Sequence, residues 1–333
     1  MKALPTIALL TAINCVFAVL GLFYRAPDLQ ITSRAPNIQT ADYEIGPQDC
    51  NRTIESSGGQ WTFFLPSALH FRDGCRVTVR NGDTWSGGRG KRLRGAFPND
   101  FTSGKRILWP TATGTVEVVG RQWVTVARPF RPRLPDGDVQ FYSDYRVDGG
   151  DTDNDCMAPG RGNACQTAAH VLYLPCNEFE FTGTDKLQTR FIVNMAKGVA
   201  DRAWIHYACP SIPGANGGAH LVLDGQGSAE LAAIGKDAIS VAVNATLSIR
   251  HLAISSETGN CVRAEFGGQV FFAGGNTIKS CAGADFSANG AGSRVYILTD
   301  YVDEGRWSRH FEGTDGGVVV QPPQKRQSAA AGN

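Results

Sequence analysis

The polar side chains that could do chemistry lie near the end of the chain, where Asp303-Glu304 with Arg306 and His310 form the densest cluster. The candidates are Asp285, Asp300, Asp303, Arg306 and His310. Hydrolysis of a glycosidic bond needs two carboxylates that face each other across a cleft. The alternative is that these are ordinary polar residues on the protein surface. We therefore treat the five as candidates for catalysis and infer no catalytic arrangement from them.

A second group places four carboxylates within eight residues, namely Asp148, Asp151, Asp153 and Asp155. Their alternate spacing could bring three oxygens around a hard cation such as calcium. An EF-hand loop needs glycine at its sixth position, where this loop has Cys156. Calcium is therefore a candidate ligand of these four residues, and the sequence indicates no other cofactor.

Other sites that carry chemistry are not indicated. His206, His220 and His251 each occur alone, which favours a structural role, and no Ser-His-Asp or Cys-His arrangement has a recognisable context. A basic group could contact phosphate, lipid head groups or acidic polysaccharide, but Trp85 and Phe97 are the only nearby aromatics for base stacking. We expect a solvated loop and no nucleic-acid partner; the group comprises Arg89, Lys91, Arg92, Arg94, Lys105 and Arg106.

Eight of the nine cysteines lie beyond the N-terminal apolar segment, and none forms the Cys-x-x-Cys spacing of a zinc site. Their order along the chain suggests pairing between neighbours: Cys50–Cys75, Cys156–Cys165, Cys176–Cys209 and Cys261–Cys281. Such a set predicts an oxidising compartment. Eight buried thiols are the alternative.

The N-terminus predicts export. Lys2 precedes 22 uncharged residues, and residues 4–24 are long and apolar enough to cross a bilayer. Residues 1–25 are therefore a membrane anchor or a cleaved signal peptide, so the expected location is periplasm, cell surface or medium. A mis-assigned start is the alternative. Residues 26–45 are polar, contain two prolines, and are interpreted as a linker.

The elements that position these residues are repeated strands. Apolar residues recur every 23 to 25 residues in the second half of the chain, and units of this size must stack on their neighbours to bury their apolar faces. Four columns are predicted: Leu223, Leu247, Val270, Val295 and Val320; Ile239, Val262, Phe286 and Phe311; Ile254, Ile278 and Val302; Ile249, Phe272 and Ile297.

Residues 46–135 predict a small all-β module, a sandwich or a barrel. Strands are expected at 61–65, 76–80, 115–119 and 122–126, separated by turn residues such as Gly58-Gly59 and Asn81-Gly82. The segments LPSALHF and GTVEVVGRQWVTV resemble small β-modules of phage tail-fibre proteins. A proline-rich stretch, 128–138, follows as a stiff connector.

Residues 140–322 resemble right-handed parallel β-helix proteins of the pectate-lyase and phage-tailspike kind. The likeness rests on Gly149-Gly150-Asp151 and Asp153-Asn154-Asp155, which stand for the loop of that family, and on Gln166-Thr167-Ala168-Ala169, which opens the helix. It implies a helix over 164–174 that caps the stack, a structural role for the acidic loop, and a homotrimer as in many tailspike-like proteins. Residues 323–333 are expected to be a disordered tail.

The function expected from this resemblance is glycan binding or a structural, adhesive role at a cell or virion surface. The alternative is a polysaccharide lyase or glycoside hydrolase that acts on the wall of the β-helix. Lyases of this fold combine carboxylate-held calcium with a basic residue, but the paired-aspartate signature of polygalacturonases is missing here.

Overall fold

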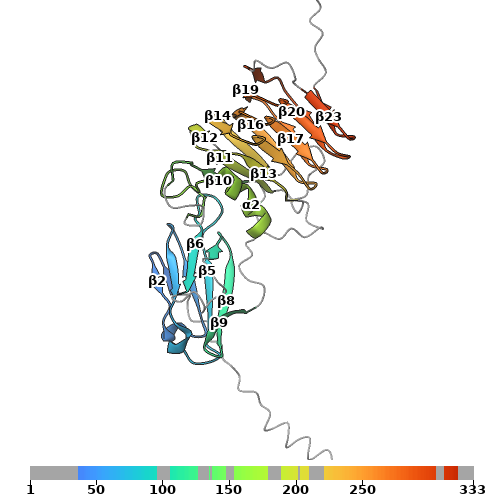
Figure 1. Cartoon of the computed structure of the whole chain (residues 1–333). Helices are drawn as coiled ribbons and strands as arrows, with labels where there is room; N and C mark the ends of the chain where they lie inside the picture. Colours follow the sequence, from blue (N-terminus) through green and yellow to red (C-terminus); the bar gives the residue numbers. More distant parts are fainter. Residues whose placement is uncertain are drawn as a thin grey trace, which may run out of the picture. The chain divides into compact units, whose positions relative to one another are not determined.

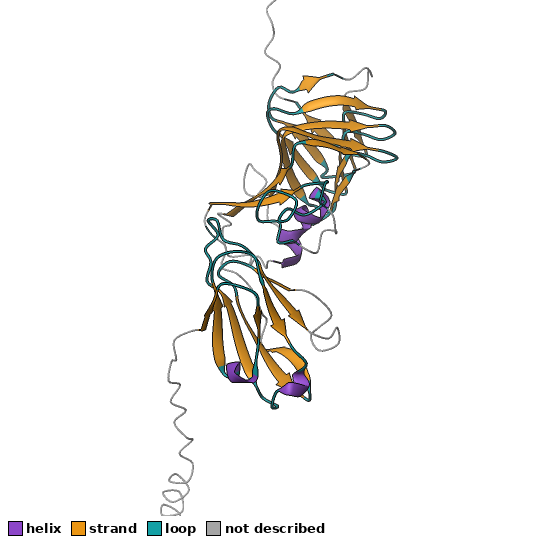
Figure 2. Ribbon diagram, turned by 90° about the vertical axis from the view of Figure 1, so that its left-hand side faces the viewer, coloured by secondary structure: helices purple, strands orange, loops and turns teal. Residues whose placement is uncertain are grey.

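The computed structural model describes residues 37–95, 106–126, 135, 137–147, 154–178, 189–201, 203–209, 221–304 and 311–321. They are mainly β-strand, with one α-helix among them (Figures 1 and 2). No helix within these ranges has the length and apolarity to cross a membrane. The predicted N-terminal anchor or signal and the predicted C-terminal tail lie outside the described residues.

Two sheets build the first part of the chain, and successive strands from β1 to β6 alternate between them. One sheet contains β1 (Asn37–Gln39), β3 (Arg52–Ser56), β5 (Arg76–Asn81), β8 (Thr113–Val119) and β9 (Gln122–Val126). The other contains β2 (Tyr43–Glu44), β4 (Thr62–Leu65), β6 (Lys91–Gly95) and β7 (Arg106–Leu108). The first three strands of each sheet are parallel. All four predicted strands are present, and the strand pairing closes no barrel among the described residues.

Two expectations for this module need correction. The segment predicted as a linker already contains β1 and β2, because Ile45 is fully buried in the core and Tyr43 packs against that core. The segment predicted as a basic loop forms β6 instead. Leu93 points into the core, and the ammonium of Lys91 is fully buried among the carbonyls of Gly58 and Gly59 and the Asp83 carboxylate.

The second part of the chain is a stack of parallel strands on three faces. The first face contains β10 (Gly137–Ser143), β11 (Thr189–Met195), β14 (Leu221–Ala233), β16 (Thr246–Ser256), β18 (Gln269–Phe272), β21 (Arg294–Ile297) and β24 (Val318–Val320). The second pairs the distal halves of β14 and β16 with β12 (Gly198–Asp201), β19 (Thr277–Cys281) and β22 (Val302–Asp303). The third contains β13 (Ile205–Tyr207), β15 (Ile239–Val241), β17 (Val262–Glu265), β20 (Phe286–Asn289) and β23 (Phe311–Thr314).

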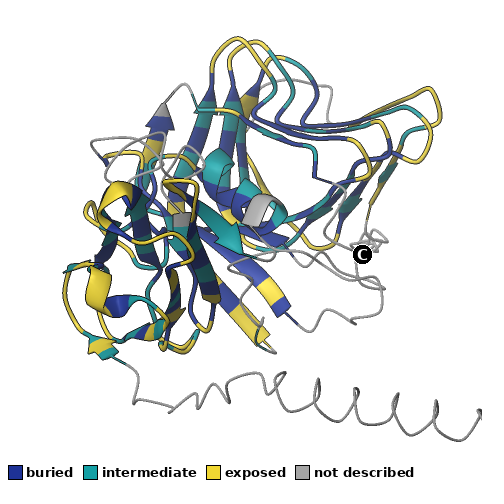
Figure 3. Cartoon of the chain, turned by 90° about the horizontal axis from the view of Figure 1, so that it is seen from below, coloured by how far each residue is buried: buried dark blue, intermediate teal, exposed yellow. Residues whose placement is uncertain are grey.

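The strand register confirms most of the predicted columns. Leu247, Val270 and Val295 are direct partners on successive strands, as are Ile249, Phe272 and Ile297. The third face carries Ile239, Val262, Phe286 and Phe311 in one column. These side chains are buried from Ile239 to Phe286, and only Phe311 on the last strand is exposed. In Figure 3 the inner faces of the strands are buried, while the turns between them are exposed.

Three members of the predicted columns are wrong. Leu223 pairs with Ile249 rather than Leu247, because extra residues between Asp224 and Ala229 shift the register of β14. Val319 takes the place predicted for Val320. Ile278 pairs with Asp303 and not Val302. Ile278 and Asp303 are 25 residues apart, whereas Val295 and Val319 are 24 apart, so no single repeat length fits both faces.

The described helix, α2 (Ala168–Glu178), begins four residues later than the sequence predicts. Its start is fixed by Thr167, whose hydroxyl accepts a hydrogen bond from the His170 backbone N–H at 3.1 Å. Such a side-chain acceptor satisfies one of the unpaired N–H groups of a first turn. The helix packs against β10, β11 and β13 (Figure 1).

All four disulfides predicted from cysteine order are formed. Their Cα–Cα distances are 5.1 Å for Cys50–Cys75, 5.0 Å for Cys156–Cys165, 6.2 Å for Cys176–Cys209 and 5.6 Å for Cys261–Cys281. Cys176 and Cys209 join α2 to the residues that follow β13. Since disulfides persist in oxidising environments, the set favours a periplasmic or extracellular location.

Candidate functional site

The candidate catalytic residues differ in burial. Asp285 is buried next to the start of β20, whereas Asp300 and Asp303 are exposed in and beside β22. Arg306 and His310 lie outside the described residues. Neither of the two cavities described below is lined by any of these carboxylates.

Tyr301 lies close to two of these carboxylates. Its ring packs against Phe272 and Phe286, at centroid distances of 5.8 and 5.3 Å. Burial, together with the negative charges of Asp285 and Asp303, raises the pKa of Tyr301 to about 12. The phenol therefore stays protonated at neutral pH, and its aromatic packing indicates a structural role.

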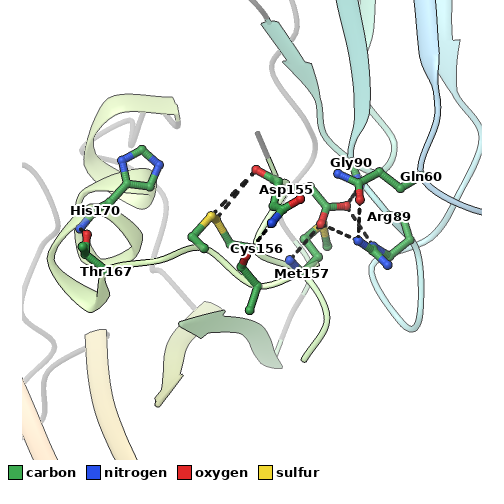
Figure 4. Close-up of a disulfide and its surroundings, with 11 residues drawn as sticks. Gln60, Arg89, Gly90, Asp155, Cys156, Met157, Thr167 and His170 are labelled. Carbon is green, nitrogen blue, oxygen red and sulfur yellow. Dashed lines mark hydrogen bonds and ion pairs between the residues drawn. A yellow bond between two sulfur atoms is a disulfide. The ribbon is translucent and has the colours of Figure 1, made fainter. Parts of the chain in front are cut away.

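Of the four carboxylates in the acidic loop, Asp155 is the one that the structure describes. Both of its carboxylate oxygens accept hydrogen bonds. It accepts hydrogen bonds from Arg89 Nε at 2.9 Å and Arg89 Nη2 at 2.8 Å, and from the backbone N–H groups of Gly90 and Met157 (Figure 4). The side chain is 1% exposed. Asp155 thus holds its loop to the residues just before β6, and its oxygens are not free for calcium. Asp148, Asp151 and Asp153 lie outside the described residues.

The disulfide of Cys156 and Cys165 lies beside His170 (Figure 4). The two sulfurs and a ring nitrogen of His170 all lie within 4.8 Å of one another, a separation that would suit a metal ion. Because the sulfurs are bonded to each other, they offer no thiolate to a metal. Cys156 and Cys165 therefore form a structural disulfide and are not ligands of a metal.

A cavity of about 920 Å³ opens between the start of α2, β12 and β13. Its walls are mainly small apolar side chains, and Tyr145 and Trp204 at its edge are 41% and 42% exposed. The Tyr145 side chain packs against the backbone of Gly198. A Cβ added at Gly198 would lie 2.4 Å from the Tyr145 hydroxyl oxygen, so only glycine fits there. A large exposed tryptophan beside a cavity is unusual, because tryptophan is ordinarily well buried.

A second cavity, of about 460 Å³, shares Trp204 and His206 with the first. Its remaining walls are polar and include Lys236, Asp237 and Glu265. The two cavities therefore adjoin at Trp204 and His206. We call this pair of cavities the Trp204 groove.

Strand alternation explains how His206 reaches the Trp204 groove. In β13 the side chains of Ile205 and Tyr207 are buried, and His206 between them faces outward. Its register partners on the next two strands are Ser240 and Arg263. The outer surface of the third face therefore presents a row of polar side chains along the stack.

Hydrogen bonds connect the members of this row. His206 Nδ1 lies 3.3 Å from Ser240 Oγ, and Ser240 Oγ donates to Glu265 Oε1 at 3.1 Å. Arg263 binds Glu265 through Nη2 and Asp237 through Nη1, each at 3.2 Å. A catalytic triad would place histidine between serine and the carboxylate, whereas here serine lies in the middle. The arrangement fixes the polar side chains and activates no nucleophile.

Lys236 completes the junction of the two cavities. Its Nζ lies 3.9 Å from the centre of the Trp204 ring, a cation–π contact. The contact favours this orientation of the indole, and the indole stays 42% exposed. An exposed aromatic face beside hydrogen-bonding groups can stack on the C–H face of a sugar ring, while the polar groups bond its hydroxyls.

Sequence reasoning assigned His206 a structural role and did not single out Trp204. A signal was present, since Trp204 and His206 lie two residues apart at the start of a strand whose other residues point inward. Comparison of the chain with protein-family models, with curated proteins and with solved structures gives no match.

Proposed function

We propose that this chain is an exported, surface-associated protein that binds glycans in the Trp204 groove. In this proposal the parallel strand stack is a short right-handed β-helix of the pectate-lyase-like and tailspike-like kind, capped by α2. The first module would be the tail-fibre-like unit that accompanies it. Association into a homotrimer and attachment to a membrane through residues 4–24 remain predictions.

One observation supports the proposal most strongly: an exposed tryptophan, in contact with a lysine, lies where an apolar cavity adjoins a polar one. Ligand sites are typically concave and mostly apolar, with a few convergent polar groups that fix orientation. The chemistry of Trp204, His206 and Lys236 suits a sugar ring. The four disulfides agree with a site that meets its ligand outside the cytoplasm.

Binding is favoured over catalysis because the carboxylates of the Trp204 groove are already paired. Asp237 and Glu265 both bind Arg263, and Asp237 also accepts hydrogen bonds from the backbone and the side chain of Asn260. A general acid or base must lie within hydrogen-bond reach of the reacting group, and these carboxylates already bind other residues of the chain.

A glycan array probed with the full chain tests the proposal. We expect one or a few glycans to bind, and Trp204→Ala to lower that binding at least tenfold. Tyr296→Ala is the matched control, since Tyr296 is a partly exposed aromatic that stacks on Phe271 and lines neither cavity. The absence of any bound glycan, or equal binding by the Trp204→Ala variant, would contradict the proposal.

The enzymatic alternative is tested separately. The full chain is incubated with pectin, alginate and bacterial exopolysaccharide, and unsaturated products and new reducing ends are measured. We expect none. Turnover that disappears in Asp303→Ala would establish a lyase or a hydrolase in place of a binding protein.

A further inference from the structure

The apolar half of the Trp204 groove is poorly suited to a bare sugar. Its walls include the apolar side chains of Ala168, Met195, Ala200 and Leu231, beside a smaller number of polar ones such as Gln166 and Thr167. A sugar ring carries several hydroxyls, and each hydroxyl that loses water against the apolar part of the wall without gaining a hydrogen-bond partner disfavours binding.

The size of the apolar half exceeds the needs of a methyl or acetyl decoration. At about 920 Å³ it lies near the upper end of the roughly 300–1,000 Å³ that hold a drug-sized ligand. Covering apolar surface of this extent with hydrocarbon is favourable, because both surfaces are then removed from water. A flexible hydrocarbon chain matches both the volume and the lining.

The two cavities adjoin, so a ligand bound at Trp204 can extend toward both. Trp204 and His206 line both cavities, and Lys236 lies over the indole at their junction. Beyond this point Ser240 and Glu265 offer hydroxyl and carboxylate oxygens. A ligand with a polar, hydroxyl-rich head and an apolar tail would place each part against its own kind of surface.

We propose that the Trp204 groove binds a glycan that carries an alkyl or acyl chain, with the chain in the apolar cavity and the sugar between Trp204 and the polar cavity. This inference rests on the proposed glycan-binding function and specifies its ligand class. The ligand is an amphiphile such as an acylated sugar or a glycolipid.

Isothermal titration of the full chain with three probes below their micellar concentrations tests the inference. The probes are octyl β-D-glucoside, methyl β-D-glucoside and sodium octanoate, so that head and tail are presented together and apart. We expect the octyl glucoside to bind at least tenfold more tightly than either of the others. Equal affinity for the two glucosides would overturn the inference, because the tail would then contribute nothing. Equal affinity for octanoate would also overturn it, because the sugar would then contribute nothing.

A cavity-filling substitution locates the tail. Val199 lines the apolar cavity and is 40% exposed, so Val199→Trp can fill the space without disturbing the core. We expect it to weaken octyl glucoside binding at least tenfold and to leave methyl glucoside binding within twofold. Leu298→Trp is the control for non-specific adsorption, since Leu298 is an exposed apolar residue outside both cavities. If Val199→Trp and Leu298→Trp bind octyl glucoside as wild type does, the inference is wrong.

The glycan array separates this inference from the function on which it rests. If array binding needs Trp204 while Val199→Trp leaves octyl glucoside binding unchanged, the glycan site stands and the tail site fails. If the array shows no Trp204-dependent glycan, the proposed function fails, whatever the titrations give. Circular dichroism of each variant establishes that the fold is retained.

Discussion

Asp155 illustrates how a residue type acquires a role from its partners. In the sequence it belongs to a run of carboxylates that resembles a calcium loop. In the structure its two oxygens accept hydrogen bonds from Arg89, Gly90 and Met157. These partners come from distant and neighbouring parts of the chain, so the sequence alone could not distinguish a structural carboxylate from a metal ligand.

Replacing Asp155 is expected to destabilise the protein. Asp155→Ala leaves Arg89, which is 16% exposed, without its main partner, and breaking a buried ion pair costs about 3–5 kcal/mol. Asp138→Ala is the matched control because Asp138 and Arg190 are 37% and 47% exposed, and such surface pairs contribute about 1 kcal/mol or less. Urea denaturation measures both. Equal losses in the two variants would show that the Arg89 contact does not stabilise the fold.

The lowered pKa of Asp144 predicts that the stability of the fold depends on pH. Its side chain is 3% exposed, and hydrogen bonds from the Arg146 guanidinium hold the pKa of the carboxyl below its usual value. A lowered pKa in the folded state adds stability above the unfolded value of about 3.9, and this stability is lost as the pH falls through the folded value. Wild type should therefore exceed Asp144→Asn in unfolding free energy at about pH 7, and the difference should shrink toward about pH 2. A constant difference across that range would contradict this origin.

At the residue scale, the sequence predicts covalent pairing better than it predicts the binding groove. The cysteines pair with neighbours along the chain, as Cys50–Cys75 and Cys261–Cys281 do. The groove instead combines Trp204 with α2 and with residues of the strands β10 to β15 and β17. Its members come together only when the coils stack, and no local motif marks them.

At the scale of elements, the alternation of inward and outward residues determines which substitutions matter. Adjacent residues of β18 show the contrast. Phe272 is fully buried and packs against Phe286 at 4.8 Å, whereas Phe271 faces outward and stacks on Tyr296 at 4.9 Å.

We expect Phe272→Ala to lower the unfolding free energy by about 3–5 kcal/mol, because it leaves a cavity inside the stack. Phe271→Ala removes a half-buried cross-strand pair, with an expected loss of about 1 kcal/mol or less. Thermal or urea denaturation of the two variants measures the difference. Similar losses at both positions would show that the two side chains are buried to a similar extent.

The spacing of apolar residues predicts the columns where coils are equal in length and fails where they are not. Between Asp224 and Ala229 the register of β14 shifts, so the column position of Leu223 cannot be obtained from a constant repeat. The strand β6 is missed for a different reason. Its Lys91 is buried only because the carbonyls of Gly58 and Gly59 and the carboxylate of Asp83 surround its ammonium, and these contacts are long-range.

At the scale of the whole molecule, the stack and the disulfides support the same account. Parallel strands leave the turns and outer faces free to carry binding groups, while the inner columns provide the core (Figure 3). Cys176–Cys209 ties α2 to the chain beyond β13, so it also fixes two walls of the Trp204 groove. The groove is therefore positioned by the stack as a whole.

The most direct test of the stacked arrangement is methyl NMR on deuterated full chain with labelled leucine and valine methyl groups. Neighbouring parallel strands lie about 4.8 Å apart. We predict NOEs between Leu247 and Val270 and between Val270 and Val295, and none between Leu247 and Val295, which are two strands apart. If neither of the first two NOEs is observed with all three residues assigned, the coils do not stack in this register and the groove built on them is wrong.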